Sequence, residues 1–196
     1  MIKELLKDYR VVLASQSPRR QNLMKELKIE FEIVLNHTVE ETYPSGLSKE
    51  QIPVYLAILK AHSVMPEVPD KTLLITADTI VWHKEGVVNK PADYEDAVYI
   101  LSQLSGSMHE VITGVCLSTK QKEHTFHAST HVYFSELTND EIRYYIDTYQ
   151  PFDKAGAYGI QEWIGYIGIE RIEGSYFNVM GLPVQRLYKE LKKVIM

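Results

Sequence analysis

Several features that define large classes of proteins are missing from this chain of 196 residues. It has one cysteine, Cys116, which excludes a disulfide framework and a cysteine-based zinc site; we expect this residue to be a small buried hydrophobe. No apolar run is long enough to cross a bilayer. Residues 1–10 are polar and charged, without the apolar core of a signal peptide. We therefore expect a cytoplasmic protein with no membrane span.

Positive charge is not in excess either. The chain carries 21 Lys and Arg against 26 Asp and Glu, a net charge of −5, so we expect no nucleic-acid partner. No Walker-type glycine loop is present, which excludes a P-loop enzyme. Hydrophobic residues make up 45% of the chain, enough for a sizeable core, and the length suits a single domain over residues 1–196, with room for two lobes.

Apolar runs alternate along the chain with segments of helical periodicity, which predicts an α/β fold with a mixed sheet. Strands are expected at residues 11–14, 31–35, 72–77 (continuing after Asp78 into 80–82), 108–118 and 124–135. Helices are expected to follow the capping residues Ser17, Ser48, Asp93 and Thr138 and to begin at Pro183. The glycine-rich segment 153–181 is expected to form loops and short strands.

The first candidate site is the turn Ser15-Gln16-Ser17-Pro18-Arg19-Arg20, which joins a strand to a helix. The start of a helix offers free backbone N–H groups and a partial positive charge, both of which suit an anion. Cations are disfavoured at that end by the helix dipole, so a bound anion would explain Arg19 and Arg20. The alternative is an ordinary capped helix with solvated arginines.

The second candidate is Asp78, interpreted as the residue at the end of an apolar strand, where a carboxylate needs a cation, a metal or a catalytic task. Lys60 and Lys90 either point toward such a site or extend into solvent. Glu40 and Glu41 lie on a predicted loop, and one of them could share a hard divalent cation with Asp78.

The third candidate is the run from Asp153 to Gln161, in which glycines permit close approach to a ligand and Lys154 adds a cation. The alternative is a glycine-rich turn. Three histidines, His124, His127 and His131, raise the question of a metal site, but their spacing places only the last two on one strand face, which argues against it.

Taken together and in order, these segments resemble the Maf family of nucleotide pyrophosphatases over nearly the whole chain. The matching motifs are Ala14 to Arg20, Ala77-Asp78-Thr79, Lys90-Pro91, Leu104-Ser105-Gly106, His109, Thr113-Gly114-Val115, Asp153 to Gln161, Gly174-Ser175-Tyr176 and Gly181-Leu182-Pro183. The resemblance implies an elongated mixed sheet flanked by helices, two lobes with a central cleft, and often a homodimer. It also implies an enzyme that hydrolyses a nucleoside triphosphate at the α–β linkage with Mg²⁺ or Mn²⁺.

The resemblance also implies roles for individual residues. The family's proton acceptor falls on Asp78, and one of its polar site residues falls on Glu41; as a hypothesis of mechanism, we expect Glu41 and Asp78 to hold the metal. The other polar site residues fall on Ser15, Arg20, Lys60 and Lys90, while three positions tied to base specificity fall on Arg19, Thr79 and Gln161. We also expect Lys154 to contact the substrate. The stretch His37-Thr38-Val39 departs from the family pattern, which leaves the choice between Glu40 and Glu41 open.

The specificity positions resemble the branch of the family that cleaves dTTP and UTP. The branch acting on 7-methyl-GTP has Trp, Gln and Glu where this chain has Arg19, Thr79 and Gln161. A glutamine amide offers both groups complementary to the N3–H and the carbonyls of uracil or thymine. The rivals are a pyrophosphatase for altered purine nucleotides and a nucleotide-sensing regulatory protein linked to cell division; intact Asp78, Lys60 and Lys90 favour the enzyme.

Overall fold

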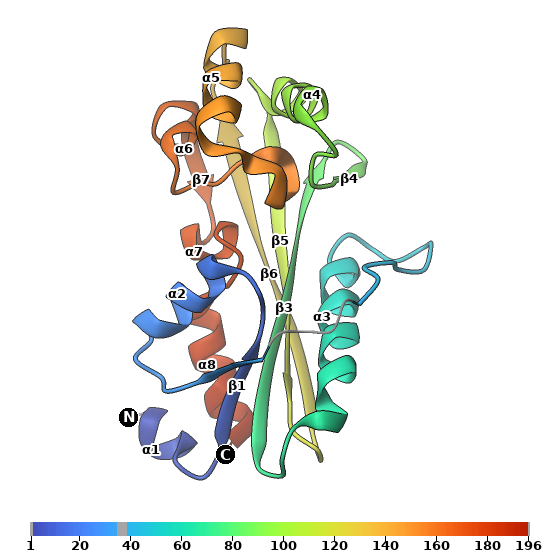
Figure 1. Cartoon of the computed structure of the whole chain (residues 1–196), viewed down its shortest axis with the longest axis vertical. Coiled ribbons are helices and arrows are strands. Elements are labelled where there is room, and N and C mark those ends of the chain that lie inside the picture. The colour runs from blue at the N-terminus through green and yellow to red at the C-terminus, as the bar shows by residue number, and fades with distance from the viewer. Residues whose placement is uncertain (1, 35–38, 196) are drawn as a thin grey trace. The chain divides into compact units, whose positions relative to one another are not determined.

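The computed structural model describes residues 2–34 and 39–195 (Figure 1). The strands are β1 (Arg10–Ala14), β2 (Glu32–Val34), β3 (Thr72–His83), β4 (Gly86–Val88), β5 (Met108–Ser118), β6 (Glu123–Phe134) and β7 (Ile169–Glu173). The α-helices are α1 (Ile2–Leu6), α2 (Pro18–Glu26), α3 (Gln51–Val64), α4 (Tyr94–Leu104), α5 (Asn139–Tyr149), α6 (Trp163–Gly168), α7 (Tyr176–Val179) and α8 (Val184–Ile195). Short 3-10 turns lie at Met65–Glu67, Pro151–Asp153 and Ala155–Ala157.

The strands form a seven-stranded mixed sheet in the order β2-β1-β3-β5-β6-β7, with β4 paired to β3. β1 is parallel to both β2 and β3, whereas β3–β4 and β6–β7 are antiparallel. The predicted α/β class with a mixed sheet is therefore confirmed. The chain divides into two compact units: unit 1 runs up to Asp78 and includes Thr113–Ala128 and the residues from Gly181 on, and unit 2 comprises Thr79–Ile112 and Ser129–Met180.

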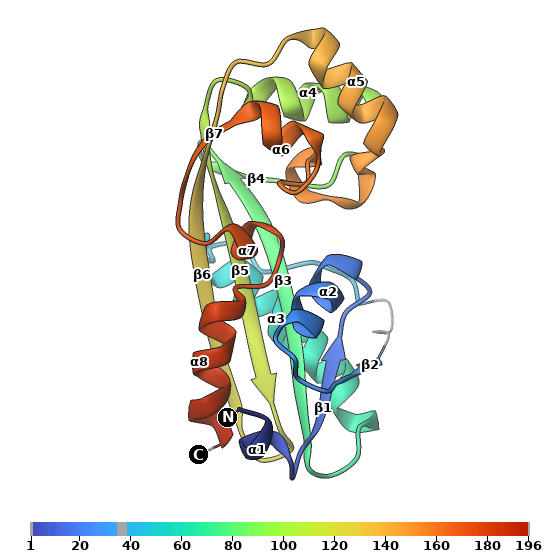
Figure 2. The same cartoon turned by 90° about the vertical axis from the view of Figure 1, so that its left-hand side faces the viewer.

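In unit 1, helices cover both faces of the strands. Val12 and Leu74 face α3, where they pack with its buried residues Ala57 and Ala61. Because side chains alternate along a strand, Val11 and its neighbours in register point to the other face, on which α2 and α8 lie (Figures 1 and 2). This sandwich fixes α2 and α3 on opposite sides of β1 and β3.

The contact between α3 and β5 depends on a glycine. A Cβ atom on Gly114 would lie 2.3 Å from the carbonyl carbon of Pro53 and from the amide nitrogen of Val54. Any other residue would push α3 away from the sheet, so the motif Thr113-Gly114-Val115 is a packing requirement for α3.

Unit 2 has its own hydrophobic core, formed by the buried faces of α4, α5 and α6 and by the chain after α5. Its members include Leu101, Leu104, Ile142, Tyr145, Ile146, Ala157, Tyr158, Ile160 and Ile164. These residues bury the segment that follows Asp153, the third candidate site of the sequence.

Most predicted helix starts are confirmed. Ser17, Asp93 and Thr138 each accept a backbone N–H at the start of their helix, and Thr138 forms a full capping box with Glu141. The capping box expected at Ser48 is only half formed: its N–H donates to Gln51 Oε1, but its hydroxyl donates to Glu50. The prediction for segment 153–181 was wrong in part, since it contains α6 and α7. α1 and β4 were not predicted, and Leu35, the last residue of the predicted strand 31–35, lies outside the described residues, as do His37 and Thr38.

Candidate functional site

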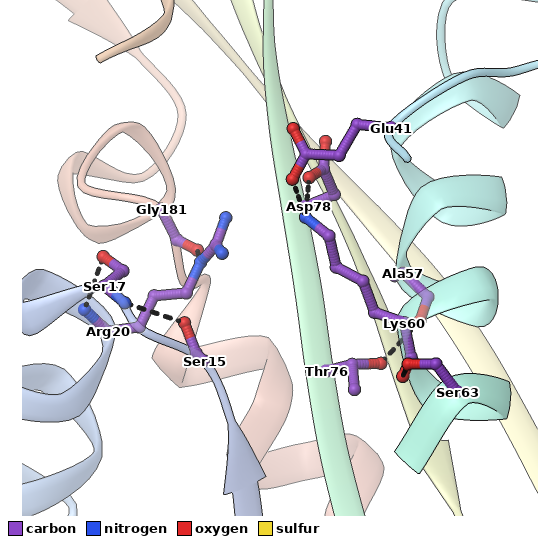
Figure 3. Close-up of polar contacts among 10 residues, drawn as sticks. All are labelled: Ser15, Ser17, Arg20, Glu41, Ala57, Lys60, Ser63, Thr76, Asp78 and Gly181. Atoms are coloured by element: carbon purple, nitrogen blue, oxygen red, sulfur yellow. Dashed lines mark hydrogen bonds and ion pairs between the residues drawn. The ribbon is translucent and has the colours of Figure 1, made fainter. Parts of the chain in front are cut away.

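The turn after β1 forms the start of α2. Ser15 is buried, and its hydroxyl accepts the N–H of Ser17 at 3.2 Å. The Ser17 hydroxyl in turn accepts the N–H of Arg20 at 3.4 Å (Figure 3). Gln21 Nε2 donates to the carbonyl of Ser15 at 3.0 Å. These bonds fix the turn so that the backbone N–H groups of the first helical turn share one direction, an arrangement that suits a phosphate.

Arg20 extends from this turn and is held by a distant part of unit 1. Its Nε donates to the carbonyl of Gly181 at 2.7 Å. Burial lowers the pKa of the Arg20 guanidinium, while the negative charges of Asp78 and Glu41 raise it and Arg19 lowers it. Arg20 therefore lies within electrostatic reach of both carboxylates, and its bond to Gly181 keeps it in place (Figure 3).

Lys60, on α3, brings two carboxylates together. Its Nζ lies 2.5 Å from Asp78 Oδ1 and 2.7 Å from Glu41 Oε1 (Figure 3). The Lys60 and Asp78 side chains are only 12% and 11% exposed, so this pair is largely shielded from water, whereas the Glu41 side chain is 46% exposed. Beneath it, the Thr76 hydroxyl donates to the carbonyl of Ala57 at 2.7 Å and ties β3 to α3.

The predicted continuation of the strand into residues 80–82 is confirmed, and the interpretation of Asp78 as the end of a strand was therefore wrong. β3 continues without interruption from Thr72 to His83, so Asp78 is in its interior. The sequence suggested an end because a charged residue interrupts the apolar run. The strand continues because Lys60 neutralises the carboxylate while the backbone keeps its place in the sheet.

The donor set of this cluster fits a hard divalent cation. Two carboxylates converge on one nitrogen, and Mg²⁺ is commonly bound by one or two carboxylates together with substrate phosphates. Within residues 2–34 and 39–195 no group of three or more His, Cys, Asp or Glu side chains is arranged to hold a metal. The residues therefore fit a metal that enters with a phosphate ligand better than one held by protein alone.

The remaining predicted site residues belong to different parts of the chain. Arg19 is half-buried on α2 in unit 1, next to Arg20. In unit 2, Thr79 is half-buried on β3, and Lys90 is exposed after β4. Lys154 and Gln161 lie in the segment between α5 and α6.

Lys154 is buried, and its ammonium contacts two carboxylates. Its Nζ lies 2.7 Å from Asp153 Oδ1 and 3.3 Å from Glu162 Oε1. Glu162 also accepts a hydrogen bond from the hydroxyl of Tyr145 on α5. Burial and then the Glu162 carboxylate raise the pKa of the Tyr145 phenol, so it remains a donor. Sequence reasoning missed Tyr145 and Glu162 because neither stands within a recognisable motif.

Gln161 lies between these contacts, and its Oε1 is buried. Among the described residues this oxygen accepts no hydrogen bond. A buried acceptor without a donor costs free energy, so this oxygen is a candidate to accept a hydrogen bond from a bound group.

Several other polar side chains are buried or paired outside the candidate site. His109 is buried, with Nε2 2.6 Å from the Tyr158 hydroxyl and its ring edge-on to Phe134; burial lowers its pKa to about 3, so it is neutral. His124 contacts Glu190 at 2.8 Å, and His131 lies 3.8 Å from Glu173. Cys116 is fully buried, as predicted, and burial raises its pKa to about 11.

The fold is shared with a known structure. The chain is similar to the structure of a HAM1 protein from Coxiella burnetii, with a TM-score of 0.54 and 17% identity, covering 94% of this chain and 99% of that one. At this identity the likeness shows the α/β fold alone. Within the described residues, no helix has the length and apolar character needed to cross a membrane.

Sequence comparison defines the family. The family model described as Maf-like protein matches residues 10–194, and the chain belongs to this family. It is 54% identical to a dTTP/UTP pyrophosphatase of Parabacteroides distasonis, over 96% of this chain and 98% of the relative. It is 53% identical to a dTTP/UTP pyrophosphatase of Phocaeicola vulgatus, over 97% and 99%. The resemblance inferred from the motifs is therefore confirmed.

Proposed function

We propose that this protein hydrolyses dTTP and UTP to the nucleoside monophosphate and pyrophosphate. The names of its relatives, which match over nearly their whole length, support this substrate class. The observation that carries the chemistry is the convergence of Asp78 and Glu41 on Lys60, within electrostatic reach of Arg20. Cations to bind phosphate and carboxylates to bind a metal or accept a proton are the groups that cleavage of a phosphoanhydride needs.

In this proposal, residues of unit 1 bind the triphosphate. Arg20, held by Gly181, and the N–H groups at the start of α2 neutralise phosphate oxygens without having to be reorganised. Lys60 contributes a further positive charge and, through its contacts, keeps Asp78 and Glu41 in place. The family resemblance implies a substrate contact for Lys90 as well. Most of the rate gain then comes from positioning and charge stabilisation.

Asp78 accepts the proton that the attacking water loses as the anhydride between the α- and β-phosphates is cleaved. Its position inside β3 holds the carboxylate rigidly, because the strand on both sides of it is paired. Glu41 and Asp78 would hold a divalent cation, Mg²⁺ or Mn²⁺, which when bound neutralises charge on the phosphates. The contact of Glu41 with Lys60 favours Glu41 over Glu40 as the second ligand.

Gln161 selects the base, and the family resemblance ties Arg19 and Thr79 to the same specificity. The buried Oε1 of Gln161 is an acceptor without a donor among the described residues, and the N3–H of uracil or thymine is a donor. The amide nitrogen can donate to a neighbouring carbonyl of the base. A pyrimidine with this pattern of donor and acceptors would therefore satisfy the hydrogen-bonding groups of the Gln161 amide.

The test is pyrophosphate release from a panel of dTTP, UTP, CTP, GTP, 7-methyl-GTP and ITP, with Mg²⁺, with Mn²⁺ and with EDTA. We expect metal-dependent release mainly from dTTP and UTP. Release mainly from ITP or 7-methyl-GTP would refute the base assignment, and release that persists in EDTA would refute the metal assignment. We further propose, on the strength of the family resemblance, that the protein is a homodimer, testable by light scattering coupled to gel filtration. We also propose a cytoplasmic location, testable by fractionation of cells that express the protein.

A further inference from the structure

A network of charged and hydroxyl groups fastens the segment that carries Gln161 in unit 2. Lys154, 8% exposed, contacts Asp153 and Glu162. The Glu162 carboxylate also accepts the hydroxyl of Tyr145, which is fully buried on α5. Burying charged groups costs free energy even when they are paired, so this arrangement needs a function or a structural benefit to offset the cost.

The same network holds the chain on the other side of Gln161. The Tyr145 hydroxyl accepts the N–H of Gly159 at 3.0 Å. A Cβ atom on Gly159 would lie 2.7 Å from the Glu162 carboxyl carbon, so the carboxylate packs directly on the glycine backbone. Tyr145 therefore binds the residue two before Gln161 and the residue just after it.

Two further contacts complete the attachment. The Ile160 side chain is buried in the unit 2 core, and the N–H of Glu162 donates to the carbonyl of Gly159 at 3.0 Å. Gln161 is thus enclosed in a short loop of which both ends are fixed, while its own Oε1 lacks a donor. The backbone on both sides of Gln161 is fixed by these contacts, whereas its side-chain amide is available to a ligand.

We infer that Tyr145, Lys154 and Glu162 are positioning residues for base selection, acting through the placement of Gln161. The inference rests on the proposed function. It gives Lys154 a role different from the substrate contact expected from the sequence, because two carboxylates engage its ammonium.

The chemistry explains why placement matters. Uracil and thymine offer an N3–H donor beside carbonyl acceptors, whereas cytosine offers an acceptor at N3 and an amino donor beside it. An amide that is free to rotate can pair with either base, since one end accepts and the other donates. Discrimination between them therefore depends on where the backbone places Gln161 against the edge of the base, and Tyr145, Lys154 and Glu162 fix that backbone.

The experiment measures binding of the α,β-methylene analogues of UTP and CTP, which are not cleaved at the α–β linkage, by calorimetry with Mg²⁺. Wild type is compared with Glu162→Gln, with the milder Tyr145→Phe, and with Gln161→Ala alone and combined with Glu162→Gln. We expect the preference for the UTP analogue to fall about tenfold in Glu162→Gln and severalfold in Tyr145→Phe. In the Gln161→Ala background, Glu162→Gln should not change the preference further, since the residue it positions is gone.

The matched control is Glu190→Gln in unit 1. Glu190 is a buried carboxylate, 6% exposed, whose Oε2 lies 2.8 Å from His124 Nε2, so its loss should lower the melting temperature and leave base preference unchanged. If Glu162→Gln and Tyr145→Phe also lower only the melting temperature, the network is structural and the inference is wrong. A wild-type protein with no preference for the UTP analogue would overturn the base assignment and this inference together, whereas wild-type preference with no effect of the variants overturns this inference alone.

Discussion

The ammonium nitrogen of Lys60 lies 2.5 Å from Asp78 Oδ1, although the two residues come from α3 and from the interior of β3. This contact is largely shielded from water, and the same nitrogen also contacts the more exposed Glu41. It resolves the difficulty of a carboxylate in the middle of an apolar strand, and it holds that carboxylate ready to bind a cation or accept a proton.

Asp78→Asn should reduce turnover of UTP by about 10²–10⁴-fold, because the amide cannot accept the proton from water. The fold should survive, since Asn occupies nearly the same volume. Asp70→Asn is the control: it also removes a Lys–Asp ion pair in unit 1, with Lys120 at 2.8 Å, but outside the site. Steady-state kinetics and circular dichroism on both proteins check this. Near-normal turnover by Asp78→Asn would contradict the role of Asp78 as the proton acceptor.

Gly114→Ala should destabilise the protein by about 1–3 kcal/mol, because the new Cβ would meet the backbone of Pro53 at 2.3 Å. Turnover should also fall, since α3 carries Lys60. Gly86→Ala is the matched control, because a Cβ there meets nothing within 4 Å. Urea denaturation and UTP turnover are measured for both. Equal stability of the two variants would contradict the packing argument.

Gln161→Glu should lower the ratio of UTP to GTP turnover by about tenfold, since the carboxylate removes the donor that faces a base carbonyl. Gln103→Glu makes the same change on the exposed face of α4 in the same unit and should leave the ratio unaltered. Unchanged relative rates in Gln161→Glu would count against a role for Gln161 in base selection.

His109 should make the protein less stable in mild acid. Burial lowers its pKa to about 3 in the folded protein, against 6.5 ordinarily, so between these values only the unfolded chain binds the proton. The contribution of neutral His109 to the free energy of unfolding is fully present above pH 6.5 and is lost as the pH falls toward 3. The loss amounts to about 2 kcal/mol between pH 7 and pH 5. The free energy of unfolding of His109→Gln should therefore fall less steeply over that range than that of wild type. Equal slopes would show that His109 is not held neutral.

The sequence allowed the prediction of local features, because these depend on neighbouring residues. Ser17, Asp93 and Thr138 cap helices through side chains that reach N–H groups three residues on, and such spacing can be seen in a sequence. The α/β class followed from the alternation of apolar runs with helical periodicity. The resemblance to the Maf family also depended on ordered motifs.

Contacts between distant segments could not be predicted. The bond from Arg20 to Gly181 joins residues 161 positions apart, and nothing at either position indicates the other. α6 was missed because Gly165 and Gly168 lower helix propensity, whereas tertiary packing of Ile164 stabilises the helix. Asp78 was placed at a strand end because the cation that neutralises it comes from another element.

The most direct test of the account identifies the products of UTP by ³¹P NMR in the presence of Mg²⁺. Cleavage between the α- and β-phosphates predicts resonances of UMP and pyrophosphate that grow in equal amounts, and their loss in Asp78→Asn. Formation of UDP and inorganic phosphate instead would place the reaction at the β–γ linkage and contradict the proposed function.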